Sequence, residues 1–208
     1  MEPENHKVIN NFINEDEVNL ILKWIEGLRH EGSDANRHLS EMSKYLNGSS
    51  FIFDISQNEI TRFITKFQSI SNVSTEKLPE FINEIINRVA QTMKFSTDNI
   101  FLQVVDMRAG GKINPHYDAS ISGYVNYKCN ISVLSENYNI HIGDEHKSIQ
   151  PRDLYGFEAS LYKHWTDEFN SRRVFLSLGF MLPYSVLGRT EDDPRCRLSQ
   201  RIERYFQS

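Results

Sequence analysis

The chain has 208 residues, enough for one domain with a hydrophobic core, and we expect a single domain over 1–208. Its 39% hydrophobic and 25% charged residues exclude global disorder, and no run of about 18 apolar residues is present to cross a membrane. The 23 basic and 28 acidic side chains give a net charge of −5, which disfavours nucleic acid as a partner.

The sequence before residue 95 is mostly helical in pattern, and we expect 1–95 to support a core that follows it. Asn14 and Glu17 have the spacing of a capping box at the start of a first helix. Polar residues over 31–50 predict a long loop, and the sequence leaves open whether this loop is a lid over a ligand. A short strand is then expected, followed by two further helices, at 51–55, 60–67 and 81–93.

After residue 95 the apolar period becomes two, which is typical of strands. The predicted strands lie at 100–108, 112–120, 127–135, 140–142, 148–150, 154–157 and 172–182. Closely spaced short strands after a helical region predict an α+β fold with a mainly β core at 96–183, either a sandwich or a small barrel. We expect the N-terminal helices to pack on one sheet, and the tail at 184–208 to form a short helix.

The cellular compartment follows from what the sequence lacks. The acidic N-terminus carries no apolar signal segment, and two cysteines, Cys129 and Cys196, make no disulfide framework. The sequence therefore predicts a reduced, cytoplasmic protein.

A candidate metal site begins in the predicted strand at 112–120. His116 and Asp118 lie two residues apart, so their side chains point to the same face of a strand. An imidazole beside a carboxylate supplies two of the three ligands of a 2-His-1-carboxylate iron site. The pattern also arises by chance, as a simple pair of neighbours. His164, which follows a predicted strand and turn, is the best-placed third ligand, because the other five histidines lie in polar segments.

A fixed cation near such a site would bind the far carboxylate of a dicarboxylate cosubstrate. Arg172 and Arg173 both stand at the start of the predicted strand at 172–182, and an arginine fork suits a carboxylate. Alternation along the strand places Arg173 on a face with a hydroxyl and a small residue, Ser177 and Gly179, whereas the face of Arg172 is otherwise apolar. We therefore favour Arg173, with Arg172 as the alternative.

These segments resemble a known family. Residues 101–118, FLQVVDMRAGGKINPHYD, are similar to the opening strands of 2-oxoglutarate/Fe(II)-dependent dioxygenases, especially the short prolyl-hydroxylase-like and AlkB-like members. The stretch from 154 through His164 to Arg173 and Ser177 is similar to the closing half of that family, and 8–17 to its usual opening segment.

The resemblance implies a double-stranded β-helix, also called a jelly roll or cupin-like fold. It implies Fe(II) on His116, Asp118 and His164, with 2-oxoglutarate and O2 as cosubstrates and ascorbate as a candidate reductant. The distal carboxylate of 2-oxoglutarate would then meet Arg173 and Ser177. Asn130 and Tyr124 are weaker candidates for contacting this cosubstrate, since a core or surface role explains each as well.

Three further residues are candidates for substrate binding. Asp106 and Arg108 stand near the end of the first core strand, and Trp165 follows a proposed metal ligand. An ion pair, solvent exposure or simple packing explains them as well. The Gly-Gly-x-Thr stretch common in prolyl hydroxylases is replaced by residues 135–141, which disfavours a protein-prolyl substrate.

The leading hypothesis is an enzyme that hydroxylates a small, amino-acid-like metabolite or natural-product intermediate and releases succinate and CO2. The alternatives are the same chemistry on a peptidyl side chain or an alkylated nucleobase, and a non-catalytic cupin-like module that binds a metal or ligand. The sequence is compatible with a monomer or a homodimer and does not identify the substrate.

Overall fold

The computed structural model describes residues 6–31, 50–54, 78–97, 100–107, 109–118, 120 and 123–196. From the N-terminus the elements are β1 (His6–Ile9), α1 (Glu15–Glu31), β2 (Ser50–Asp54), α4 (Glu80–Met93), β3 (Ile100–Met107), β4 (Ile113–His116) and β5 (Tyr124–Leu134). They continue with β6 (Tyr138–Ile142), β7 (Glu145–Ile149), β8 (Leu154–Glu158), β9 (His164–Thr166), β10 (Arg173–Pro183) and the short 3₁₀ helix η2 (Tyr184–Leu187).

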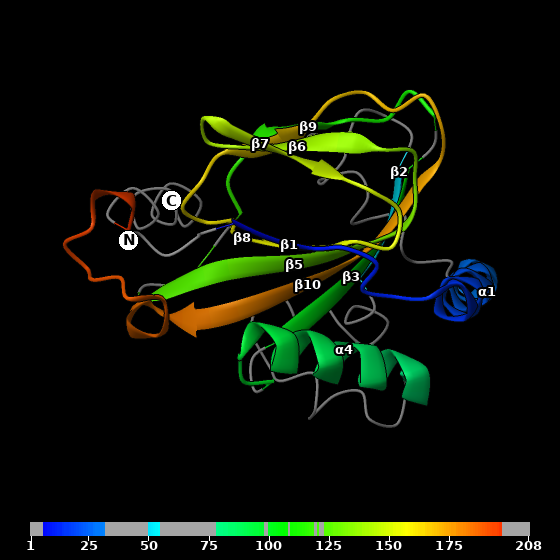
Figure 1. Ribbon diagram of the computed structural model, residues 1–208, viewed down its shortest axis with the longest axis horizontal. Coiled ribbons are helices and arrows are strands. Elements are labelled where there is room, and N and C mark those ends of the chain that lie inside the picture. The colour runs from blue at the N-terminus through cyan, green and yellow to red at the C-terminus, as the bar shows by residue number, and fades with distance from the viewer. Residues whose placement is uncertain are drawn as a thin grey trace.

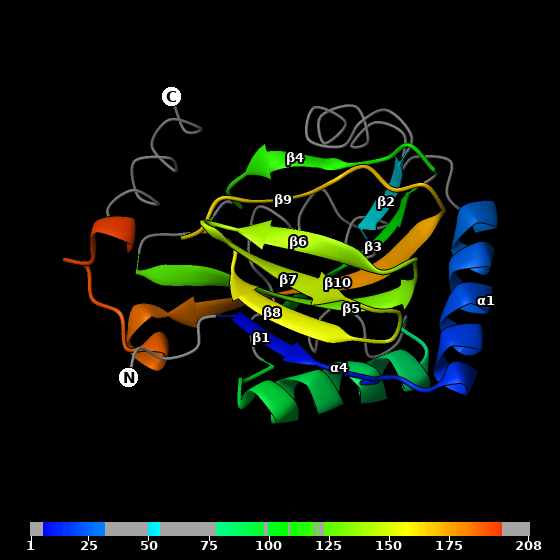
Figure 2. The same cartoon turned by 45° about the horizontal axis from the view of Figure 1, so that its top comes forward.

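The strands form two antiparallel sheets that face each other (Figures 1 and 2). The larger sheet has the order β1-β8-β5-β10-β3-β2, and the smaller has the order β4-β9-β6-β7. Strands β3 to β10 pass repeatedly from one sheet to the other, with β3, β5, β8 and β10 in the larger and the remaining four in the smaller. This is the double-stranded β-helix that the family resemblance implies.

Alternation along β10 divides the larger sheet into two faces. Val174, Leu176 and Leu178 are fully or almost fully buried and belong to the core that also holds the apolar side of α1 and α4. Arg173 and Phe175 point to the other face, toward the smaller sheet. The two described helices therefore pack against the core of one sheet, as predicted, with α4 across the outer face and α1 beside the strands, and they leave the inward face for a site (Figure 1).

Local signals fix the ends of both helices. The amide of Asn14 donates to the Glu17 carboxylate at 2.9 Å, and the amide of Glu17 donates to Asn14 Oδ1 at 2.9 Å, so the predicted capping box is confirmed. Pro79 is the N-cap of α4, and Lys94 closes that helix in the left-handed conformation. None of the described helices is long and apolar enough to span a bilayer.

Several predicted elements differ from the structure or lie outside its description. The strand expected at 112–120 ends at His116, and β1 and β9 were not among the predicted strands. The predicted helix at 60–67, nearly all of the loop at 31–50 and the tail helix beyond residue 196 lie outside the described residues.

A buried ion pair fixes the segment that follows β10. Arg189 donates to both carboxylate oxygens of Glu158, at 3.2 Å and 2.8 Å, and the two side chains are 12% and 2% exposed. Replacing Arg189 by methionine leaves the Glu158 carboxylate buried without its partner, so we expect a loss of about 3 kcal/mol in the free energy of unfolding. Urea unfolding measures this loss. The double variant Arg189→Met with Glu158→Gln is expected to recover most of the lost stability. Equal losses in the single and the double variant would contradict a stabilising ion pair between Arg189 and Glu158.

Candidate metal centre

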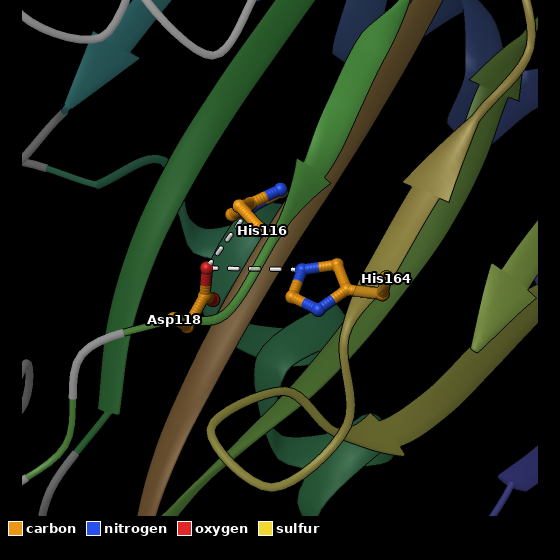
Figure 3. Close-up of side chains that lie close together, drawn as sticks. All are labelled: His116, Asp118 and His164. Atoms are coloured by element: carbon orange, nitrogen blue, oxygen red, sulfur yellow. Dashed lines mark ion pairs between the residues drawn. The ribbon is translucent and has the colours of Figure 1, made fainter. Parts of the chain in front are cut away.

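Pairing between two short strands of the smaller sheet brings the predicted ligands together. His116 ends β4 and lies opposite His164, the first residue of β9. Asp118 follows β4 by two residues, and its amide donates to the carbonyl of Ala159 at 3.0 Å. Figure 3 shows the three side chains, here called the triad, converging from these two segments. Asp118 therefore reaches the site from the irregular segment after β4, and not from within the strand that the sequence predicted.

The donor atoms of the triad have the spacing of a metal site. Asp118 Oδ1 lies 3.3 Å from His116 Nε2 and 3.8 Å from His164 Nε2 (Figure 3). One donor atom from each side chain lies within 4.8 Å of the others, and no second such group occurs in the described part of the chain. Adjacent ligands bound at about 2.1 Å lie roughly 3 Å apart, so two imidazoles and one carboxylate fit an ion such as Fe(II) after a small contraction.

The surroundings of His164 prepare it to bind a metal. Its Nδ1 lies 3.0 Å from the carbonyl oxygen of Tyr162, which only accepts hydrogen bonds, so Nδ1 carries the proton and Nε2 presents a lone pair to the site. Burial lowers the pKa of His164 to about 4 and outweighs the opposing effect of Asp118, so the ring is neutral at pH 7. The ring of Phe157 packs edge-on against it, with centroids 4.8 Å apart.

Asp118 is ionised in the same surroundings. Burial on its own raises the pKa of this carboxyl, but Lys128, the hydrogen bond from His116 and the charge interactions with His164 and His116 outweigh burial and hold the pKa well below its ordinary value. The triad therefore offers one carboxylate charge to a bound cation.

The neutral state of His164 makes the stability of the metal-free protein depend on pH. The unfolded chain takes up a proton near pH 6.5, whereas the folded site resists protonation down to about pH 4, so stability falls as the pH falls between these values. From pH 7.5 to pH 5.0 we expect His164 to account for a loss of about 2 kcal/mol. Urea unfolding in the presence of EDTA tests this prediction with His164→Gln, and with His146→Gln on exposed β7 as the control. The prediction is wrong if His164→Gln keeps the full pH dependence of the wild type.

Arg173 is a cation in the interior between the sheets. Its side chain is fully buried, and its Nη2 donates to the hydroxyls of Tyr138 at 2.7 Å and Tyr155 at 3.0 Å. The guanidinium also lies over the rings of Tyr138, Phe169 and Phe175, at 3.9, 4.6 and 4.4 Å from their centroids. Its Nε and Nη1 are buried and have no hydrogen-bond partner.

Arg173 also lacks a counter-ion among the residues that the structure describes. Burial raises the pKa of Tyr138 well above its ordinary value despite the nearby arginine, so this phenol is neutral. Arg172 instead pairs with Asp106 on the other face of the sheet, through contacts of 2.9 and 2.8 Å. A buried guanidinium with two unused donors fits the carboxylate of a ligand, as 2-oxoglutarate would provide.

Aromatic side chains connect the triad to Arg173. Phe157 packs against His164 and stacks on Tyr155, with ring centroids 6.2 Å apart, and the hydroxyl of Tyr155 accepts the hydrogen bond from Arg173. Phe157, Tyr155 and Tyr138 belong to one buried cluster between the sheets. The candidate metal ligands and the buried cation therefore border the same interior.

The structure places the other cosubstrate candidates differently from one another. Asn130 and Ser177 are buried neighbours on β5 and β10, and Asn130 Oδ1 has no hydrogen-bond partner. By alternation they share the inward face of Arg173. Tyr124 pairs with Pro183 at the opposite end of β10 from Arg173. Tyr124 is therefore distant from Arg173 along β10, and its contact with this cosubstrate stays a prediction.

The substrate-binding candidates lie away from the triad or outside the description. Asp106 faces the helix side of β3 and is occupied by Arg172, so we no longer assign it to substrate. Trp165 stacks on His141, with ring centroids 4.8 Å apart, and alternation in β9 turns it away from His164. Arg108 lies outside the described residues.

Sequence reasoning missed three residues of this interior. Tyr138 and Tyr155 contact Arg173, and Lys128 contacts the triad through Asp118 Oδ2 at 3.5 Å. Lys128 and Asn130 share one face of β5, a strand that is otherwise largely apolar. A lysine inside such a strand is a signal that could have identified this residue.

Comparison with solved structures supports the fold. A prolyl-4-hydroxylase from Pseudomonas putida is similar, with a TM-score of 0.57 and 10% identity, covering 86% of this chain and 92% of that chain. A viral collagen prolyl hydroxylase from Paramecium Bursaria Chlorella virus-1, in its 2OG complex, is similar with a TM-score of 0.54 and 11% identity. The match covers 86% of this chain and 97% of that chain. A prolyl hydroxylase from Trichoplax adhaerens, in complex with a hypoxia inducible factor oxygen degradation domain peptide fragment, is similar with a TM-score of 0.53 and 13% identity. The match covers 88% of this chain and 86% of that chain.

No protein-family model matches the sequence, and no curated protein matches it either. At 10–13% identity the likeness to these three structures establishes a shared fold. The resemblance to prolyl-hydroxylase-like dioxygenases that the sequence suggested is thus confirmed at the level of architecture. The chemistry has to be argued from the site itself.

Proposed function

We propose that the protein is a 2-oxoglutarate- and Fe(II)-dependent dioxygenase that hydroxylates a small, amino-acid-like molecule. One observation supports this most strongly: a 2-His-1-carboxylate triad borders the same interior as a fully buried arginine with two unused donors. The triad suits Fe(II), and the arginine suits the distal carboxylate of 2-oxoglutarate. The likeness in fold to three prolyl hydroxylases agrees with the proposal.

Each residue has a stated task in this proposal. His116, Asp118 and His164 hold the iron, and the carbonyl of Tyr162 fixes the tautomer of His164. Arg173 would bind and orient the distal carboxylate of 2-oxoglutarate, and Asn130 and Ser177, paired on the same face of the sheet, are the proposed further contacts to this cosubstrate. When bound, Fe(II) and 2-oxoglutarate supply the oxidising chemistry, with O2 consumed and succinate and CO2 released. Ascorbate is the proposed reductant that keeps the iron ferrous.

Burial is the second contribution of the chain. Phe157, Phe175 and Tyr155 are buried between the sheets and would give the triad and Arg173 a largely apolar surrounding. In such an environment the charge interactions that orient a dicarboxylate are stronger than in water.

Succinate formation tests the proposed activity. Protein supplied with Fe(II), 2-oxoglutarate, O2 and ascorbate is expected to form succinate slowly without added substrate, and the rate should fall to background in His116→Ala and in His164→Ala. Unchanged succinate formation in either variant would contradict the proposal. A protein that binds metal but neither binds nor consumes 2-oxoglutarate would be a cupin-like binding module instead.

A peptidyl substrate is the second candidate, because the similar protein from Trichoplax adhaerens was solved in complex with a peptide fragment. Free amino acids and the same residues within short peptides separate the two candidates. We expect stimulation of succinate formation by a free amino acid. Stimulation by peptides alone would favour the second candidate.

A further inference from the structure

Lys128 lies against the triad, and the function proposed above gives it no role. Its side chain is 8% exposed, and its Nζ lies 3.5 Å from Asp118 Oδ2. A lysine is rarely buried without a specific partner, because removing an ammonium group from water is unfavourable.

A row of three residues across the larger sheet places the side chain of Lys128 against an aromatic ring. Lys128 on β5 lies opposite Gly179 on β10, and Gly179 lies opposite Phe101 on β3. Because Gly179 has no side chain, the Phe101 ring lies across it, where a Cβ would overlap the ring. The ammonium group sits 4.4 Å from the centre of that ring.

Gln103 gives the ammonium group a second oxygen partner. Lys128 Nζ donates to Gln103 Oε1 at 3.1 Å, and Gln103 follows Phe101 by two residues on the same face of β3. Two oxygens and one ring therefore surround Lys128 Nζ at short distances, 3.1 Å to Gln103 Oε1, 3.5 Å to Asp118 Oδ2 and 4.4 Å to the centre of the Phe101 ring. Such a fixed group can impose an orientation on the carboxylate that it contacts.

The two oxygens of Asp118 are divided between different neighbours. Oδ1 faces the Nε2 atoms of His116 and His164, whereas Oδ2 faces Lys128. We propose that Lys128 is a positioning residue, which engages Oδ2 so that Asp118 offers a single oxygen to the metal. This inference rests on the proposed function and adds to it a residue that controls how Asp118 binds the metal.

The consequence concerns the positions left open on the metal. A carboxylate released at Oδ2 can rotate and offer both oxygens, and the second oxygen would take a position that 2-oxoglutarate needs for chelation. Lys128 is therefore expected to affect the binding of 2-oxoglutarate more than the binding of the metal.

Cobalt(II), used as a spectroscopic probe without oxygen, tests the proposal. The Lys128→Met variant is expected to bind cobalt(II) at least as well as wild type, because a nearby positive charge has been removed. Its visible cobalt spectrum should already differ before 2-oxoglutarate is added, and its affinity for 2-oxoglutarate should fall about tenfold. Lys147→Met, on the exposed strand β7, is the matched control and should behave as wild type.

Gln103→Leu separates orientation from charge, since it removes a partner of Lys128 but keeps the ammonium group. We expect a spectral change and a smaller loss of 2-oxoglutarate affinity in the same direction. A wild-type spectrum and affinity in Lys128→Met would overturn the proposal, as would Gln103→Leu matching wild type while Lys128→Met loses affinity. Failure of the wild type itself to bind 2-oxoglutarate would contradict the proposed function instead.

Discussion

Replacing Arg173 by methionine is expected to weaken 2-oxoglutarate binding by about 100-fold, because a buried cation that pairs with a ligand carboxylate contributes several kcal/mol. The same change should leave the ligand-free protein at least as stable as wild type. Arg173 is fully buried with two unused donors, and methionine keeps much of its contact with the surrounding rings while removing an unpaired charge. Calorimetric titration of 2-oxoglutarate into manganese(II)-loaded protein and urea unfolding measure the two effects.

Arg172→Met is the matched control, one residue away and on the opposite face. Arg172 pairs with Asp106, which is 1% exposed, so its removal should reduce stability and leave 2-oxoglutarate affinity within about twofold of wild type. The reverse pattern, with lost affinity in Arg172→Met and wild-type affinity in Arg173→Met, would refute the assignment of the cation.

The second large effect concerns the triad. Alanine at His116 or His164 is expected to reduce Fe(II) affinity by more than about 100-fold, because even residues that only support metal ligands contribute 10- to 100-fold. Anaerobic equilibrium dialysis measures this affinity. The circular dichroism spectra of the variants should match the wild-type spectrum, because His116 is the last residue of β4 and His164 the first residue of β9.

His141→Ala is the control for these two variants. His141 lies on β6, pairs with Asp167 at 3.0 Å and stacks on Trp165, which alternation turns away from the triad. Its loss should leave Fe(II) affinity unchanged. Equal affinity in His164→Ala and His141→Ala would remove the basis for the candidate metal centre.

Backbone periodicity explains what the sequence could predict. The alternation of side chains in a strand is fixed by geometry, so the pattern over 172–182 correctly placed Arg173 on the inward face and Arg172 on the other. The capping box at Asn14 and Glu17 is similarly local, and the structure contains both of its hydrogen bonds.

Features that depend on pairing between strands were not predictable in the same way. Strand β9 has three residues, too few for a periodic signal, although it carries His164. Trp165 adjoins His164 in sequence, yet neighbours in a strand point to opposite faces, and Trp165 stacks on His141. Two arrangements depend on the register between strands, which no single segment specifies. They are the contact of Tyr138 with Arg173 and the row of Lys128, Gly179 and Phe101.

Anaerobic titration of the metal-free protein with Fe(II) and 2-oxoglutarate, followed by visible spectroscopy, tests the central claim most directly. We expect a weak charge-transfer band that requires both additions, is absent in His164→Ala and weakens in Arg173→Met. Folded, metal-loaded wild-type protein without such a band would contradict the proposed chemistry and favour a binding module with the same fold.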